Sequence, residues 1–192
     1  MYTLCATEKS VDQQRDFEAA LLRMLQHTSY YDITISGLCL EAGYSRKVFY
    51  RLFEKRIDVL IALLDHTFLD FGSYQPDASV GEGDLHRFFG FWKVQRPLLD
   101  ALKKNGLSSM LTERALNHIF RENPVILKQF GADTLMLGRE RLLFFVSGLF
   151  SLVLDWHEHD YDTSIDQMSA LLMDLLMNKP IRNSHHDEPA ML

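Results

Sequence analysis

Apolar residues recur three and four positions apart along most of the chain, and no segment shows the alternation expected of a strand. Near the N-terminus five residues carry this spacing: Phe17, Ala20, Leu21, Met24 and Leu25. They predict an amphipathic helix that opens at a capping box formed by Ser10 and Gln13 and ends at the turn-forming residues after His27. The pattern as a whole predicts an all-α fold.

Two short helices joined by a turn are predicted next. Thr34 is placed to cap the first of them, which the sequence Ala42-Gly43 ends, because glycine tolerates the positive φ of a helix C-terminus. Ser45 is placed to cap the second, which runs from Arg46 to Leu52.

The rest of the chain is predicted to be helical as well. A long helix begins near Lys55, and its pattern fades at Phe71, where a loop is expected. The longest helix spans residues 134–158, and Thr163 with Asp166 is placed to cap the last one. We expect three parts: a small helical domain at 1–56, a larger helical domain at 57–180, and a disordered polar tail at 181–192.

The charge distribution indicates one basic surface on an acidic protein. The formal net charge is −6, but residues 1–60 carry eight basic and eight acidic side chains. Residues 61–192 therefore account for all of the net negative charge. Within the first part, residues 44–56 hold five Lys or Arg against Glu54 alone, a local charge of +4. Such a short basic stripe suits a small DNA-contacting surface, and the acidic remainder discourages non-specific binding.

The stripe lies in a predicted helix-turn-helix, from Ile33 to Arg56. In such a unit the second helix enters the major groove, and its first residues lie nearest the base edges. Here those residues are Ser45, Arg46 and Lys47. An arginine at this place can form two hydrogen bonds to guanine, and a lysine can reach a base or a phosphate.

The other residues of the second helix have separate predicted roles. Phe49 and Phe53, four apart, are expected to fix the helix to the core. Tyr50 and Arg51 fall on another face, where we expect their polar tips to be free.

This segment resembles the DNA-binding region of the TetR family, whose pattern is Thr-[Val/Ile]-x-x-[Ile/Leu]-Ala-x-x-Ala-Gly-Val-Ser-x-x-Thr-x-Tyr-x-[His/Tyr]-Phe, followed by Lys and Leu-Leu. The chain matches that pattern at Thr34, Ile35, Leu38, Ala42, Gly43, Ser45, Tyr50, Phe53 and Leu60. It departs with Cys39 for Ala, Tyr44 for Val, Val48 for Thr, Leu52 for His or Tyr, and Arg56 for Lys. A weaker resemblance, to the family's penultimate helix, covers residues 145–160, so the likeness extends over nearly the whole chain.

The resemblance implies a transcriptional regulator, most commonly a repressor, that binds operator DNA. It also implies phosphate contacts from three residues: Thr34, Tyr50 and Arg56. Because Val48 and Leu52 replace side chains that usually touch the DNA backbone, part of the affinity is expected from Arg51 and the two basic residues at the helix tip.

The larger unit is expected to form a homodimer. Residues 142–156 are apolar on nearly all sides, which is typical of a helix buried on every face. A two-fold dimer would bury the same patch twice, whereas the alternative is a helix internal to a monomer. The predicted interface comprises Leu142, Phe145, Leu149, Leu152, Trp156, Met168, Leu172 and Leu175.

An aromatic stripe in the larger unit has two interpretations. Phe88, Phe89 and Trp92, together with Met110 and His118, either pack as core or line a cavity for a small-molecule effector. The resemblance implies such an effector, which would move the helix beginning near Lys55 and so release the protein from DNA.

No catalytic, metal or cofactor site is predicted. The sequence has no nucleophile with a partnering base, no glycine-rich phosphate loop and no cysteine cluster. His157 and His159 lie two apart and do not share a helix face, which favours a surface cluster over a pair of metal ligands. Because neither a signal-peptide pattern nor a bilayer-length apolar run is visible, we expect a reduced, cytoplasmic protein without a membrane partner.

A second hypothesis belongs to a different functional class. The apolar residues Val48 and Leu52 suggest a protein that keeps the fold and binds an effector or another protein, with weak or no DNA binding.

Overall fold

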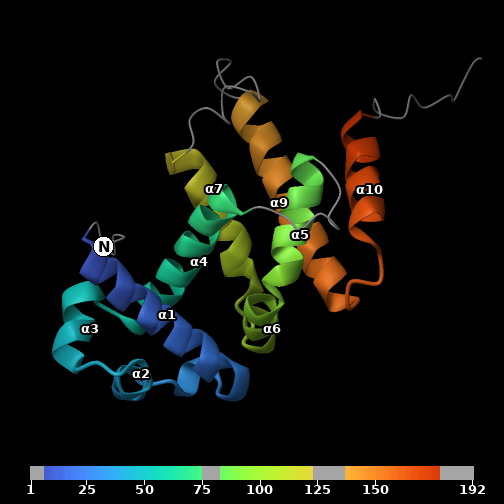
Figure 1. Ribbon diagram of the computed structural model, residues 1–192. Helices are drawn as coiled ribbons and strands as arrows, with labels where there is room; N and C mark the ends of the chain where they lie inside the picture. Colours follow the sequence, from blue (N-terminus) through green and yellow to red (C-terminus); the bar gives the residue numbers. More distant parts are fainter. Residues whose placement is uncertain (1–6, 75–82, 123–136, 178–192) are drawn as a thin grey trace, which may run out of the picture.

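Every regular element in the described part of the chain is helical, which confirms the all-α class. The computed structural model describes residues 7–74, 83–122 and 137–177 (Figure 1). In chain order the elements are α1 (Glu8–His27), the 3-10 turn η1 (Tyr30–Asp32), α2 (Ile35–Ala42), α3 (Arg46–Leu52), α4 (Arg56–Ser73), α5 (Asp84–Val94), α6 (Arg96–Lys104), α7 (Ser108–Glu122), α9 (Leu137–Glu158) and α10 (Ile165–Met177).

Helices α2 and α3 begin and end where the sequence predicts. The Thr34 hydroxyl accepts a hydrogen bond from the Gly37 amide at 3.0 Å and so caps α2. Gly43 ends α2 with a φ of 75°, in the left-handed region that glycine adopts most readily. The Ser45 hydroxyl accepts from the Val48 amide at 3.4 Å and caps α3.

Two other predicted helix ends are wrong, because both helices extend further. Helix α1 begins at Glu8, so Ser10 lies inside its first turn, where Glu8 interacts favourably with the helix dipole. Helix α4 runs past Phe71, where a loop was expected, and ends at Ser73. Its last turn is stabilised by Arg87 of α5, which donates to the carbonyls of Phe71 and Gly72 at 2.5 and 3.1 Å.

The predicted cap of α10 is displaced by one residue. The reciprocal hydrogen bonds join Ser164 and Gln167, at 3.0 and 3.2 Å, instead of Thr163 and Asp166. Thr163 has a different role, because its carbonyl accepts a hydrogen bond from Trp156 Nε1 at 2.7 Å and so holds the turn against the end of α9.

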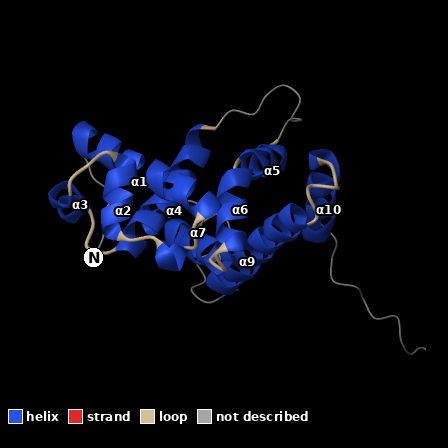
Figure 2. Cartoon of the chain, turned by 90° about the horizontal axis from the view of Figure 1, so that it is seen from below, coloured by secondary structure: helices blue, strands red, loops and turns tan. Residues whose placement is uncertain are grey.

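Helix α4 joins the two parts of the fold. Helices α1, α2 and α3 lie together at one end, and α10 lies at the opposite end (Figures 1 and 2). Helix α4 packs against α1 and against α7, while α1 also contacts α6. Helix α7 in turn packs on α9, and α5 packs on α10. The small N-terminal unit is therefore seated on both α4 and α6.

Some predictions fall outside the described residues, namely the tail at 181–192 and the start of the longest helix at residue 134. Within the described residues that helix, α9, ends at Glu158 as predicted. In the described part of the chain, no helix has the length and apolar character needed to cross a membrane.

Candidate nucleic-acid interface

Helix α3 is fixed to the core through one face. Phe49 and Phe53 are buried, as their spacing predicts, and both rings meet Phe17 of α1 edge-on, with centroids 5.6 and 5.7 Å apart. Leu52 is also buried, and Val48 packs partly buried against the same core. The two apolar residues that departed from the motif therefore serve the packing of α3.

The opposite side of α3 is exposed. Ser45, Arg46 and Lys47 are exposed at its start, and Tyr50 is 53% exposed one turn later. Within the described residues, the side chains of Arg46 and Lys47 form no hydrogen bond or ion pair. Two cationic side chains thus stand on a rigid helix with their charged ends directed to solvent.

Arg51 differs from this arrangement. Its guanidinium donates a hydrogen bond to Oε1 of Gln13 in α1, so the expectation of a free polar tip at Arg51 is wrong. The side chain is exposed, but this contact directs it along α1. The basic surface is therefore concentrated at Arg46 and Lys47.

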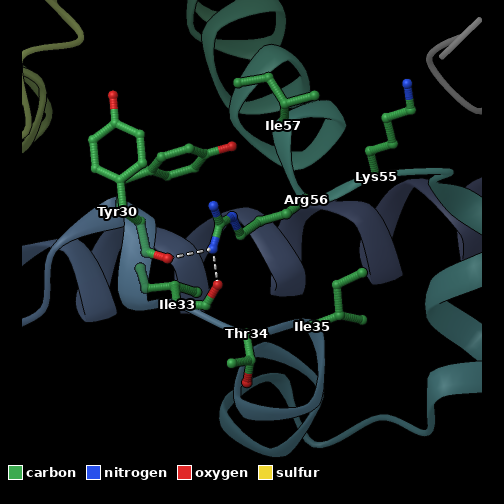
Figure 3. Close-up of a pocket in the computed structure, with 8 residues that line it drawn as sticks. Tyr30, Ile33, Thr34, Ile35, Lys55, Arg56 and Ile57 are labelled. Carbon is green, nitrogen blue, oxygen red and sulfur yellow. Dashed lines mark hydrogen bonds between the residues drawn. The ribbon is translucent and has the colours of Figure 1, made fainter.

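Arg56, at the start of α4, binds the backbone that precedes α2. Its Nη1 donates to the carbonyls of Tyr31, at 3.2 Å, and Ile33 (Figure 3). The guanidinium carbon also lies 4.3 Å from the centroid of the Tyr30 ring, a cation–π geometry. The side chain predicted to contact phosphate is thus engaged within the chain.

A shallow depression surrounds this arginine. It has a volume of about 430 Å³ and is lined by Tyr30, Tyr31, Ile33, Thr34, Ile35, Lys55, Arg56 and Ile57. Figure 3 shows the Lys55 ammonium and the Thr34 hydroxyl pointing away from the Arg56 guanidinium. Because these polar groups do not converge on one point, the depression is not built to hold a single anion.

The turn between α2 and α3 is tied to α1. Tyr44, which stands where the motif has valine, donates its hydroxyl to Asp16 Oδ2 at 2.6 Å, and its ring lies 5.4 Å from that of Phe17. The hydrogen bond to Asp16 raises the pKa of Tyr44. Cys39 is buried beside it in the core, and this burial raises the pKa of its thiol. Both departures from the motif are accommodated by packing.

Ring contacts bring four of the five predicted effector residues, all except Met110, into one aromatic cluster. Phe88, Phe89 and Trp92 are buried, whereas Met110 and His118 are partly buried. The His118 ring stacks on Phe68 of α4, with centroids 5.7 Å apart, and the same Phe68 ring meets Trp92 at 5.6 Å. Trp92 Nε1 is buried and has no hydrogen-bond partner among the described residues. Helix α4 therefore takes part directly in this cluster.

The predicted dimer residues lie mostly on the inner face of α9 and α10. Leu142, Leu149, Trp156, Met168 and Leu172 are buried within the chain itself, and Phe145 and Leu152 are partly buried. The side chain of Leu175 lies outside the described residues. The prediction that this face forms a dimer interface is therefore corrected, because the face packs against α5, α6 and α7 of the same chain. A copy of the chain would have to meet the other face of α9 and α10.

Two polar side-chain pairs that the sequence did not reveal connect α4 to its neighbours. On one side His66 Nδ1 lies 2.6 Å from Glu18 Oε1 of α1, with both side chains buried. Burial raises the pKa of Glu18, and the nearby His66 opposes that effect. On the other side Asp65 accepts two hydrogen bonds from Arg114 of α7, at 2.8 and 2.7 Å.

No group of three or more His, Cys, Asp or Glu side chains suited to a metal ion occurs among the residues described. His157, which sequence reasoning placed in a surface cluster, is instead buried and lies 2.8 Å from Asp100 of α6. Comparison with known proteins gave no further identification: no protein-family model, curated protein or solved structure matches the chain significantly.

Proposed function

We propose that this chain is a homodimeric transcriptional regulator of the TetR type, which binds operator DNA and is released from it by a small-molecule effector. Helix α2, the turn at Gly43 and α3 would form the helix-turn-helix, with α3 in the major groove. Helices α5 to α10 would hold the effector and the dimer interface.

The observation that carries the proposal is the two-sided character of α3. One face is locked by Phe49 and Phe53, and the other presents Arg46 and Lys47 to solvent. A groove-reading helix needs both properties, because base readout requires cationic donors held in a fixed orientation.

The dimer would form through the outer face of α9. Phe144, Gly148 and Ser151 follow the i, i+4, i+7 spacing of one helix face, and all three are exposed. Phe144 is 84% exposed, and no atom of the described residues would lie within 4 Å of a Cβ at Gly148. A large apolar residue beside two small ones lets a second helix approach closely, as an isologous dimer requires. Two recognition helices in such a dimer would meet sites about 34 Å apart on DNA.

The effector would bind at the aromatic cluster around Trp92. The buried indole N–H of Trp92 lacks a partner among the described residues, and a ligand with a hydrogen-bond acceptor would satisfy it. Because Phe68 of α4 lies in the same cluster, a ligand there would act directly on the helix that carries the N-terminal unit. Its effect on DNA affinity is limited to the difference in its affinity for the two conformations.

Selection from a library of randomised duplex DNA tests the proposal. The wild-type chain should enrich a palindromic sequence, and Arg46→Ala combined with Lys47→Ala should abolish the enrichment. On the enriched duplex, this double variant should also lower the slope of log affinity against log salt by up to about two, because each lost phosphate contact lowers it by about one.

A matched control separates local contact from total charge. Lys93→Ala combined with Lys103→Ala removes the same two charges from exposed positions on α5 and α6. This control should bind as the wild type does. Failure of the wild type to enrich any duplex would refute the DNA-binding proposal, whereas equal loss of binding in both double variants would refute the assignment of the recognition helix.

A further inference from the structure

The end of α6 is hydrogen-bonded to the turn that precedes α2. The Tyr30 amide donates to Asn105 Oδ1 at 2.6 Å, and both residues are buried. Asn105 is itself held in place, because its Nδ2 donates to the Ala101 carbonyl at 2.8 Å. This one side chain therefore connects the larger part of the fold to the backbone from which α2 starts.

Arg56 binds the same turn from the side of α4. Its Nη1 donates to the carbonyls of Tyr31 and Ile33, and its guanidinium lies over the Tyr30 ring (Figure 3). Thr34, the N-cap of α2, directly follows Ile33 in the chain. The η1 turn is thus held between α6 and α4 immediately before the proposed DNA-binding helices.

Two further hydrogen bonds join α6 to the end of α1. Gln26 Nε2 donates to the Pro97 carbonyl at 2.9 Å, and Lys104 Nζ donates to the Gln26 carbonyl at 2.6 Å. The segment from the end of α1 to the η1 turn therefore has polar contacts with both ends of α6. A displacement of α6 cannot leave this segment unchanged.

We infer that Asn105 and Arg56 are positioning residues for the DNA-binding surface, and that α6 controls this surface through the η1 turn. The inference rests on the proposed function, and it gives Arg56 a role at the start of α2 in place of the phosphate contact that the resemblance implied. Without the Asn105 amide the buried Tyr30 N–H loses its acceptor, so the turn must shift to find another. The orientation of α2 and α3 then relaxes.

Binding of the selected duplex to Asn105→Ala tests this role. We expect affinity to fall about tenfold, since a hydrogen bond whose loss leaves a buried donor unsatisfied has an effect of that order. Asn117→Ala, which alters the same residue type in α7 at a partly exposed position, is the matched control and should bind like the wild type. The melting temperature of each variant shows that the folded protein is being compared.

Arg56→Met distinguishes a positioning residue from a phosphate contact. It should weaken binding and leave the salt slope unchanged, whereas loss of a phosphate contact would lower the slope by about one. The double variant Asn105→Ala, Arg56→Met should bind little more weakly than the weaker single variant, because both changes loosen the same turn. A reduced slope, or additive losses in the double variant, would overturn the inference.

Amide hydrogen exchange measured by NMR tests the coupling without DNA. In Asn105→Ala the amides of Tyr30 and of Leu38, which donates to the Thr34 carbonyl, should exchange faster, and Asn117→Ala should leave both unchanged. If Tyr30 alone is affected, the coupling from α6 to α2 is refuted. If the coupling holds but no duplex is ever enriched, the DNA-binding proposal fails and the mechanical link stands.

Discussion

Replacing Glu18 with alanine measures how much the contact between α1 and α4 contributes to stability. The side chains of Glu18 and His66 are 2% and 5% exposed and lie 2.6 Å apart. Removal of one partner from a buried pair destabilises a protein by about 3–5 kcal/mol, because the other polar group is left buried without compensation. We expect the free energy of unfolding to fall by that amount, a large part of the roughly 5–15 kcal/mol of a typical domain.

Urea unfolding followed by circular dichroism is the assay. With a slope of about 2.5 kcal/mol per molar urea, a loss of about 4 kcal/mol lowers the midpoint by about 1.6 M. All variants are compared at one protein concentration, because the stability of the proposed dimer would depend on that concentration. Arg23→Ala is the control: it breaks the 2.7 Å pair with Glu41, whose partners are both well exposed, and should cost less than about 1 kcal/mol.

A loss of less than about 1 kcal/mol in Glu18→Ala would refute the importance assigned to the pair. Glu18→Leu combined with His66→Leu identifies the cause, because an apolar replacement of a whole buried pair is often neutral or stabilising. If this double variant is as unstable as Glu18→Ala, the unpaired histidine is not the source of the destabilisation.

Three further outcomes are expected. Burial raises the pKa of Glu18 above 4.5, so the protonated carboxyl contributes fully to stability below that pH, and this contribution is lost as the pH rises through the folded-state pKa. Over that rise, the urea midpoint of Glu18→Gln should increase relative to that of the wild type when both are measured at several pH values. A difference in midpoint that stays constant with pH would contradict this. Phe49→Ala should lower the free energy of unfolding by about 3–5 kcal/mol through the cavity it leaves, whereas replacing the exposed Leu40 with alanine should change it little. Equal effects of the two substitutions would argue against a rigidly packed α3. Gly43→Ala should destabilise the protein by about 1–2 kcal/mol because Gly43 has a positive φ. Gly72→Ala, at a helical position with as much space around it, should stabilise the protein by up to about 1 kcal/mol. Melting temperatures that shift in the same direction in both variants would refute this explanation by backbone conformation.

Local signals in the sequence placed the ends of α2 and α3 correctly. Thr34, Gly43 and Ser45 each act on backbone within three residues, so their effect on α2 and α3 could be predicted without knowledge of the tertiary fold. The cap of α10 could not, because Thr163 and Ser164 are adjacent residues with similar capping ability. The hydrogen bond from Trp156 to the Thr163 carbonyl, a tertiary feature, decides between them.

Contacts between distant segments were beyond reach of the sequence. Arg51 was expected to be free, and its partner Gln13 lies 38 positions earlier. On α9, periodicity could not choose a face because nearly every side is apolar, so Leu149 was assigned to a dimer while Phe144 was passed over. The choice between inner and outer face depends on where α5, α6 and α7 pack, which no single helix specifies.

The two polar side-chain pairs of α4 also constrain how this protein can change over evolution. Asp65 and His66 are neighbours in sequence, but successive residues of a helix point about 100° apart around its axis. Asp65 therefore faces α7, and His66 faces α1. Loss of the acidic partner alone would leave a poorly solvated basic side chain in either pair. Substitutions of Asp65 should therefore accompany substitutions of Arg114, and substitutions of His66 should accompany those of Glu18. In related sequences these positions should vary as two independent pairs, and their joint variation would trace the path along which α4 holds the N-terminal unit.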